Sequence, residues 1–182
     1  MSNTANGSLQ VRKLTYAAVC LALALVLPLL TGQIPEIGSA LCPMHIPALL
    51  CGFLCGWPWG LAVGLISPLL RSVIFGMPAM FPGAVAMSFE LATYGAVSGL
   101  LYKILPRRKS SVYITIVVAM LLGRAVWGIA RLILAGLSGQ SFTWALFLAG
   151  AFTNAVPGII LHLVLVPLLV IVLEKAGLSL NK

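Results

Sequence analysis

Long apolar runs, separated by short polar segments and by clusters of glycine and proline, make up most of the chain. A helix needs about 20 apolar residues to cross the hydrocarbon core of a bilayer, and most of these runs approach that length. The expected helices cover about residues 13–30, 44–57, 60–75, 83–104, 112–135 and 142–174. The pattern therefore predicts an all-α membrane protein, a six-transmembrane-helix bundle that forms one integral membrane domain over residues 1–182.

Glycine and proline set the expected helix ends. The second helix stops at the sequence GWPWG, residues 56–60, which makes it short for a crossing. An alternative interpretation treats the second and third helices as one re-entrant hairpin. The last helix is long, and we expect Pro157 and Pro167 to bend or divide it.

Positive charge predicts the orientation of the bundle. Six crossings put both termini on one side, and the Lys and Arg residues outside the apolar segments all fall on that side. They are Arg12, Lys13, Lys103, Arg107, Arg108, Lys109, Lys175 and Lys182. The loops on the opposite side carry no Lys or Arg, and the first of them contains Glu36. Because basic loops stay in the cytoplasm, both termini are predicted to be cytoplasmic.

Composition excludes several classes of function. The 182 residues are 61% hydrophobic and 8% charged, with a mean hydropathy of +1.12, so no aqueous catalytic domain fits beside the helices. The net charge of +8 does not form a solvated basic stripe, which argues against nucleic acid as a partner and leaves membrane lipid. The chain contains no aspartate, no phosphate-binding loop of the GxxxxGK[ST] type and no CxxC pair. We therefore expect neither enzymatic activity nor a metal or cofactor.

Four ionisable residues lie inside the apolar runs: Arg71, Glu90, Arg124 and Arg131. A charge at membrane depth costs at least about 2.5–3.5 kcal/mol, so it normally faces a polar cavity or a charged partner. One glutamate cannot neutralise three guanidinium groups. The surplus predicts a pocket for a small anionic solute, because arginine binds carboxylates with two parallel hydrogen bonds.

Other polar residues are expected at a similar depth. Trp127 shares a helix face with Arg124 and Arg131, and Asn154 and His45 lie at the corresponding height of neighbouring helices. The alternative for Trp127 is packing, and Asn154 and His45 could instead satisfy backbone groups freed by nearby prolines.

A structural alternative also exists for the charged residues themselves. Glu90 would then pair with one arginine and lock two helices together, while Arg71 would reach the outer headgroups. His162 is expected to be structural.

Small residues at four-residue spacing form a second pattern. Ala18 and Ala22 follow it on the first helix. Such a seam lets two helices approach closely, either within the bundle or, on a terminal helix, at the surface of another subunit.

Four features of the chain point to one family: the six short helices, the basic loop between the fourth and fifth helices, the Ala18-xxx-Ala22 spacing, and the stretch from Met44 to Tyr102, which begins MHIPALLCGFLCGWPWG. In these features the chain resembles an S component. S components are the substrate-binding subunits of energy-coupling factor (ECF) vitamin transporters. The resemblance implies a multi-pass protein of the prokaryotic plasma membrane that binds a vitamin in an outward-facing pocket. It also implies a transmembrane coupling subunit and two ATPase subunits as partners, with Ala18 and Ala22 at the contact with the coupling subunit.

Within that family the stretch from His45 to Glu90 is most similar to the pantothenate branch. The resemblance and the surplus of arginine both favour a carboxylate vitamin, with Arg71, Arg124 and Arg131 as candidate contacts. Glu90 would orient one of these arginines or accept a ligand hydroxyl.

Other interpretations remain open at this point. Biotin, folate, pyridoxine or hydroxymethylpyrimidine are alternative vitamins. A self-contained proton-coupled carrier, in which Glu90 exchanges a proton beside Arg131, and a purely structural scaffold are alternative classes of function.

Overall fold

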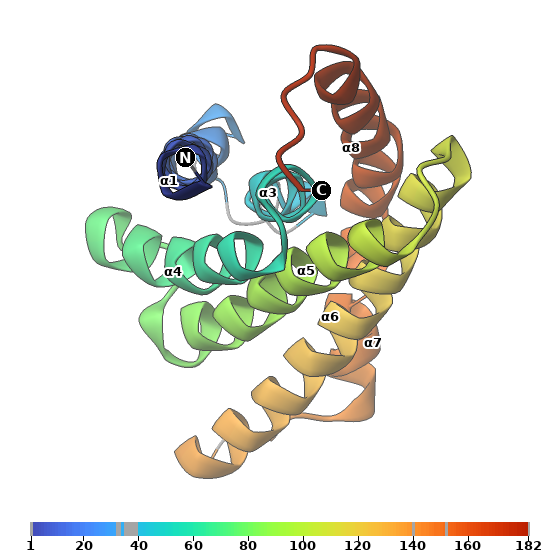
Figure 1. Cartoon of the computed structure of the whole chain (residues 1–182). Helices are drawn as coiled ribbons and strands as arrows, with labels where there is room; N and C mark the ends of the chain where they lie inside the picture. Colours follow the sequence, from blue (N-terminus) through green and yellow to red (C-terminus); the bar gives the residue numbers. More distant parts are fainter. Residues whose placement is uncertain (1, 32–33, 35–39, 140, 152, 182) are drawn as a thin grey trace.

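The computed structural model describes residues 2–31, 34, 40–139, 141–151 and 153–181, and the side chains from residue 7 onward within these ranges. The helices are α1 (Ser2–Val26), α3 (His45–Cys55), α4 (Trp57–Phe75), α5 (Val85–Ile104), α6 (Lys109–Ser138), α7 (Trp144–Ala151) and α8 (Val156–Lys175) (Figure 1). Short single-turn segments adjoin them at η1 (Leu27–Thr31), η2 (Met80–Ala84) and η3 (Thr153–Ala155). These described ranges contain no strand, and the expected all-α membrane bundle is confirmed.

Among the residues that the structure describes, five helical stretches are long and apolar enough to cross a membrane. They cover Gly7–Leu30, Trp57–Phe75, Met80–Ile104, Lys109–Ser138 and Trp144–Lys175. Helix α3 has 11 residues, which at 1.5 Å per residue gives a length of about 16 Å. It ends at Gly56, whose φ of 97° favours glycine, and α4 begins directly afterwards with Pro58 in its first turn.

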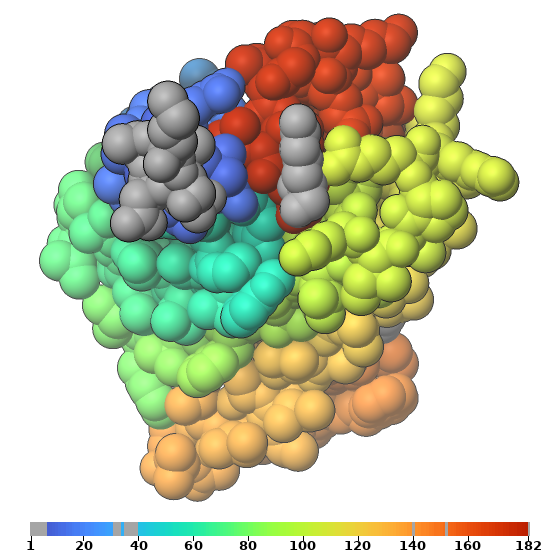
Figure 2. Space-filling model, viewed as in Figure 1, coloured from blue at the N-terminus to red at the C-terminus, as the bar shows by residue number. Residues whose placement is uncertain are grey.

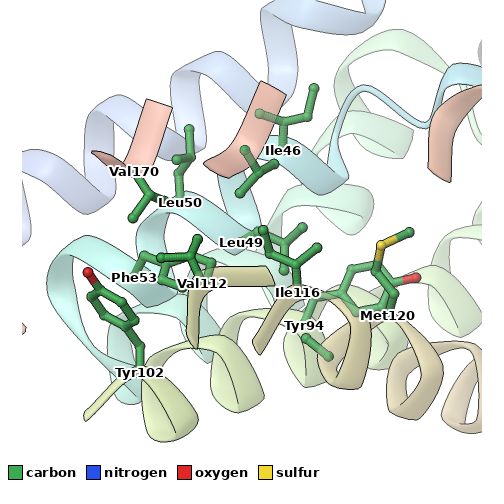
Figure 3. Packing of buried hydrophobic residues seen from close by; sticks show 12 residues of the cluster. Ile46, Leu49, Leu50, Phe53, Tyr94, Tyr102, Val112, Ile116, Met120 and Val170 are labelled. Atoms are coloured by element: carbon green, nitrogen blue, oxygen red, sulfur yellow. The ribbon is translucent and has the colours of Figure 1, made fainter. Parts of the chain in front are cut away.

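The short helix α3 forms the centre of the bundle. Each of its residues is buried, which explains why it needs no polar face. Its side chains Leu49 and Phe53 pack against residues of α5, α6 and α8 (Figure 3). The rings of Phe53 and Tyr102 meet edge to face, with their centroids 4.9 Å apart. A helix of uniformly apolar sequence is stable here because neighbours surround it on every side.

Helices α4 and α5 are joined by direct contact of their backbones. A methyl group at Gly95 would overlap the backbone of Gly60, and one at Gly64 would overlap the backbone of Leu91. These glycines therefore pack within the bundle and fix the relative position of the two helices.

The C-terminal tail folds back onto α3, as Figure 1 shows. The backbone N–H of Leu180 donates to Leu54, and the side-chain amide of Asn181 donates to the carbonyls of Gly52 and Gly99. Arg107 in turn donates to the carbonyl of Asn181 at 2.7 Å. The tail thus ties together α3, α5 and the start of α6.

The last predicted helix is divided just before Pro157, whereas Pro167, the other proline expected to bend or divide it, lies inside α8. Helix α7 ends at Ala151, η3 follows, and α8 starts with Pro157 in its first turn. Figures 1 and 2 show the second half of α6 and α7, in gold and orange, lying together at the lower end of the molecule.

Candidate functional site

A buried polar network surrounds Glu90 on α5. Its Oε1 accepts a hydrogen bond from Tyr94 at 2.9 Å and pairs with Arg124 Nη1 of α6 at 2.9 Å. The Nε2 atom of His45, at the start of α3, lies 3.4 Å from the same oxygen. Glu90 and Tyr94 are separated by one helical turn, so one helix face supplies both groups. Glu90 is 1% exposed and Arg124 is 7% exposed, so their opposite charges compensate each other out of contact with solvent.

Cys42 is the point where this network meets α8. Its carbonyl oxygen lies 3.0 Å from His45 Nδ1 and 3.2 Å from His162 Nε2. Because a carbonyl only accepts, each of these ring nitrogens carries the proton. The Cys42 thiol also lies 3.7 Å from Arg124 Nη2. One residue therefore contacts groups on α3, α6 and α8.

Arg71 is held by different partners. Its Nη1 donates to the carbonyl of Leu25 in α1 at 2.7 Å, and its guanidinium lies over the ring of Phe75 at 5.0 Å. The side chain is buried, and neither partner belongs to the network around Glu90. Arg71 therefore links α4 to α1.

The remaining predicted residues, Trp127, Arg131 and Asn154, share a hollow of about 260 Å³ between α6, α7 and η3. Its other lining residues are Ala135, Ser141, Phe142, Leu146, Ala149 and Gly150. Gly150 has no side chain where the edge of the Trp127 ring lies, so this indole fits against α7.

The charge of Arg131 is not compensated by the residues that surround it. Its guanidinium lies over the ring of Phe142 at 5.6 Å, and its buried Nε has no hydrogen-bond partner in the described part of the chain. No hydrogen bond or ion pair joins Arg131 to any residue that the structure describes. An aromatic ring attracts a cation only weakly compared with a carboxylate, so this guanidinium keeps its capacity to bind an anion.

A second hollow, of about 400 Å³, lies beside Phe142 and Phe147. Its lining is Ala125, Gly128, Ile129, Leu132, Phe142, Thr143, Trp144 and Phe147, without a charged side chain. It therefore offers no cation to pair with a carboxylate. In the described residues no group of three or more metal-ligating side chains comes together.

The two alanines predicted at a subunit contact lie on the outer face of α1. Ala18 and Ala22 are exposed, whereas Ala17, Cys20 and Ala24 on the same helix are buried. The bundle leaves the surface of these two small residues uncovered.

Sequence reasoning brought together residues that the structure divides into the network around Glu90, the hollow beside Arg131 and the separate Arg71, and it missed two members of the network, Tyr94 and Cys42. Tyr94 was detectable from its spacing of four residues from Glu90. Cys42 had no comparable signal, because its backbone carbonyl makes the contacts with His45 and His162.

Comparison with known families gives one result. A family model described as the ECF transporter, substrate-specific component, matches residues 12–170. The chain belongs to this family. It is therefore a substrate-specific subunit of an ECF transporter, a multi-pass membrane protein and not an enzyme. The comparison with curated proteins and the comparison with solved structures gave no match.

Proposed function

We propose that this ECF substrate-specific subunit binds a small anionic vitamin, with pantothenate as the favoured candidate, and that Arg131 contacts the ligand carboxylate. The observation that carries the proposal is the guanidinium of Arg131, which lines a hollow and has no anionic partner among the described residues. The ligand carboxylate would supply the missing charge.

Other groups of the hollow suit the rest of such a ligand. Asn154 offers an amide donor and acceptor, Ser141 offers a hydroxyl, and Trp127 offers a flat apolar surface. Pantothenate carries one carboxylate, an amide and two hydroxyls on a short branched chain. The combination of one cation with a few neutral polar groups supports a ligand of this chemistry over a cationic vitamin.

Uptake would depend on partner subunits. We propose that the ligand enters from outside the cell, that both termini are cytoplasmic, and that a coupling subunit and two ATPases drive release into a prokaryotic cell. The basic residues Arg107, Arg108 and Lys109 between α5 and α6 support this orientation. The exposed face of Ala18 and Ala22 supports a contact between α1 and the coupling subunit.

Isothermal titration of the purified protein tests the ligand assignment. The panel contains pantothenate, biotin, folate, pyridoxine and hydroxymethylpyrimidine. Arg131→Gln should weaken binding of the preferred carboxylate by about 10- to 100-fold, the range for one charge-assisted hydrogen-bonded contact. Arg108→Gln, which removes an exposed arginine outside the hollow, is the matched control and should change nothing. Tighter binding of a neutral vitamin, with no effect of Arg131→Gln, would overturn the proposal.

A transport assay tests the dependence on partners. Liposomes that contain this subunit alone should not accumulate the vitamin in response to a pH gradient. Liposomes that also contain the coupling subunit and the ATPases should accumulate it when ATP is supplied. Accumulation by the subunit alone would instead establish a self-contained proton-coupled carrier.

A further inference from the structure

The buried network around Glu90 and the hollow beside Arg131 share two walls, one formed by α6 and the other by η3 and α8. On α6, Arg124 of the network precedes Arg131 of the hollow by seven residues, or about 10 Å along the helix. On the opposite wall, Asn154 of the hollow lies in η3, and His162 of the network lies eight residues later in α8. Whatever fixes Arg124 relative to His162 therefore also fixes the separation of Arg131 and Asn154.

Residues 40–42 contact both of these walls. The carbonyl of Cys42 accepts from His162 of α8, and its thiol contacts Arg124 of α6. A methyl group at Gly158 would lie 2.5 Å from the carbonyl oxygen of Ala40, so α8 touches this segment along its backbone. A movement of α6 against α8 would break one of these contacts unless Cys42 shifted as well.

The backbone of Cys42 indicates that its position is imposed by its neighbours. Its φ of 47° lies in the left-handed region, which a cysteine seldom adopts. Such a conformation persists only where surrounding contacts hold it. Contacts with His45, His162 and Arg124 help to hold Cys42 here.

We propose that Cys42, held by His45, His162 and Arg124, braces the two walls of the ligand hollow, so that Arg124 and His162 are positioning residues and Arg131 is the contact for the anion. The proposal rests on the proposed function only for the identity of the molecule in the hollow. A group that contacts the carboxylate should change the affinity only for ligands that have a carboxylate. A brace should change the affinity equally for every ligand that fits between the walls.

Two probes that differ only in charge separate these roles. Pantothenate has a carboxylate, and panthenol replaces it with a neutral CH₂OH group. Arg131→Gln should weaken the binding of pantothenate but not of panthenol, and should therefore abolish the preference between them. His162→Phe keeps a ring but removes the hydrogen bond to Cys42, and it should weaken both probes by about tenfold with their ratio unchanged. His162→Gln restores a donor and should recover most of the affinity. The titration stoichiometry reports the folded fraction, so a loss of protein is not mistaken for a loss of affinity.

The thiol of Cys42 gives a readout that needs no ligand. In a variant with Cys20→Ala, Cys51→Ala and Cys55→Ala, Cys42 is the one remaining cysteine, and it is buried. Labelling by a water-soluble methanethiosulfonate reagent should be slow, and His162→Phe should accelerate it by about tenfold or more.

These outcomes distinguish the two proposals. Faster labelling in His162→Phe supports the brace whether or not pantothenate binds. If pantothenate does not bind, that result rejects the ligand assignment alone. Unchanged labelling, or a loss of affinity for pantothenate alone in His162→Phe, overturns the brace and leaves the assignment of Arg131 intact.

Discussion

Glu90 of α5 and Arg124 of α6 form an ion pair at 2.9 Å in the interior of the bundle. This pairing shows which of the three arginines has a carboxylate as its partner. Arg124 has the carboxylate, Arg71 has the carbonyl of Leu25, and Arg131 has only the face of an aromatic ring among the described residues. Because Arg124 and Arg71 have these partners, Arg131 is the specific candidate for anion binding.

Removing one partner of the pair should destabilise the protein severely. Glu90→Gln leaves the guanidinium of Arg124 buried and without a counter-charge, and we expect the free energy of unfolding to fall by roughly 3–5 kcal/mol. Thermal unfolding in detergent, followed by the fluorescence of a thiol-reactive dye, measures the loss.

The double variant Glu90→Gln with Arg124→Met is the matched control. It removes both charges at once, so it should be clearly more stable than Glu90→Gln alone. Equal melting temperatures for the single and double variants would show that the two charges are not energetically coupled.

The division of the site into a network and a hollow could not be predicted from sequence. Helical spacing put Arg124, Trp127 and Arg131 on one face of one helix. It could not say which arginine meets Glu90, because that depends on how far α5 and α6 are rotated and shifted against each other. The contact of Glu90 with Tyr94 is local, so the spacing of four residues could have revealed it, although Tyr94 was not predicted.

The fold was more accessible to sequence than the site, because glycine and proline act locally. Gly56 separates α3 from α4, and Pro157 stands in the first turn of α8, as their backbone restrictions require. The folding of the C-terminal tail back onto α3 was not predictable, because Asn181 donates hydrogen bonds to carbonyls that lie 129 and 82 residues away in sequence.

Gly95 should tolerate no side chain. Gly95→Ala places a methyl group against the backbone of Gly60, which cannot move as a flexible side chain would, and we expect a loss of about 1–3 kcal/mol or more. Gly136→Ala is the control, since no atom lies within 4 Å of its added methyl group, and it should stabilise α6 by about 0.5–1 kcal/mol. Unfolding temperatures of the two variants should shift in opposite directions; a harmless Gly95→Ala would contradict the backbone contact.

Asn181 should stabilise the whole bundle although it lies at the end of the chain. Asn181→Ala removes the two hydrogen bonds to Gly52 and Gly99, with an expected cost of about 1–2 kcal/mol. Asn181→Asp keeps the shape but places oxygen against carbonyl oxygen, so it should cost more than the alanine. Proteolysis at the C-terminus should become faster in the same order, and equal rates in all three proteins would refute this role.

Arg71 is expected to act on stability and not on the ligand. Arg71→Met keeps much of the packing but removes the hydrogen bond to Leu25, so the melting temperature should fall. Affinity for pantothenate, measured by titration on the folded fraction, should stay within about twofold of the wild type. A loss of affinity that matches that of Arg131→Gln would instead make Arg71 a ligand contact.

The exposed face of α1 should matter only in the assembled transporter. Ala18→Trp and Ala22→Trp add bulk where the isolated bundle has no neighbour, so vitamin binding by the purified subunit should be unchanged. In membranes that contain the coupling subunit and the ATPases, the same variants should reduce ATP-driven uptake at least about tenfold, because close helix contact requires small residues. Val164→Trp on α8, also exposed, controls for a large side chain that faces lipid and should leave uptake intact. If all three variants transport normally, the coupling subunit docks on another face, and the exposure of Ala18 and Ala22 reflects nothing more than contact with lipid.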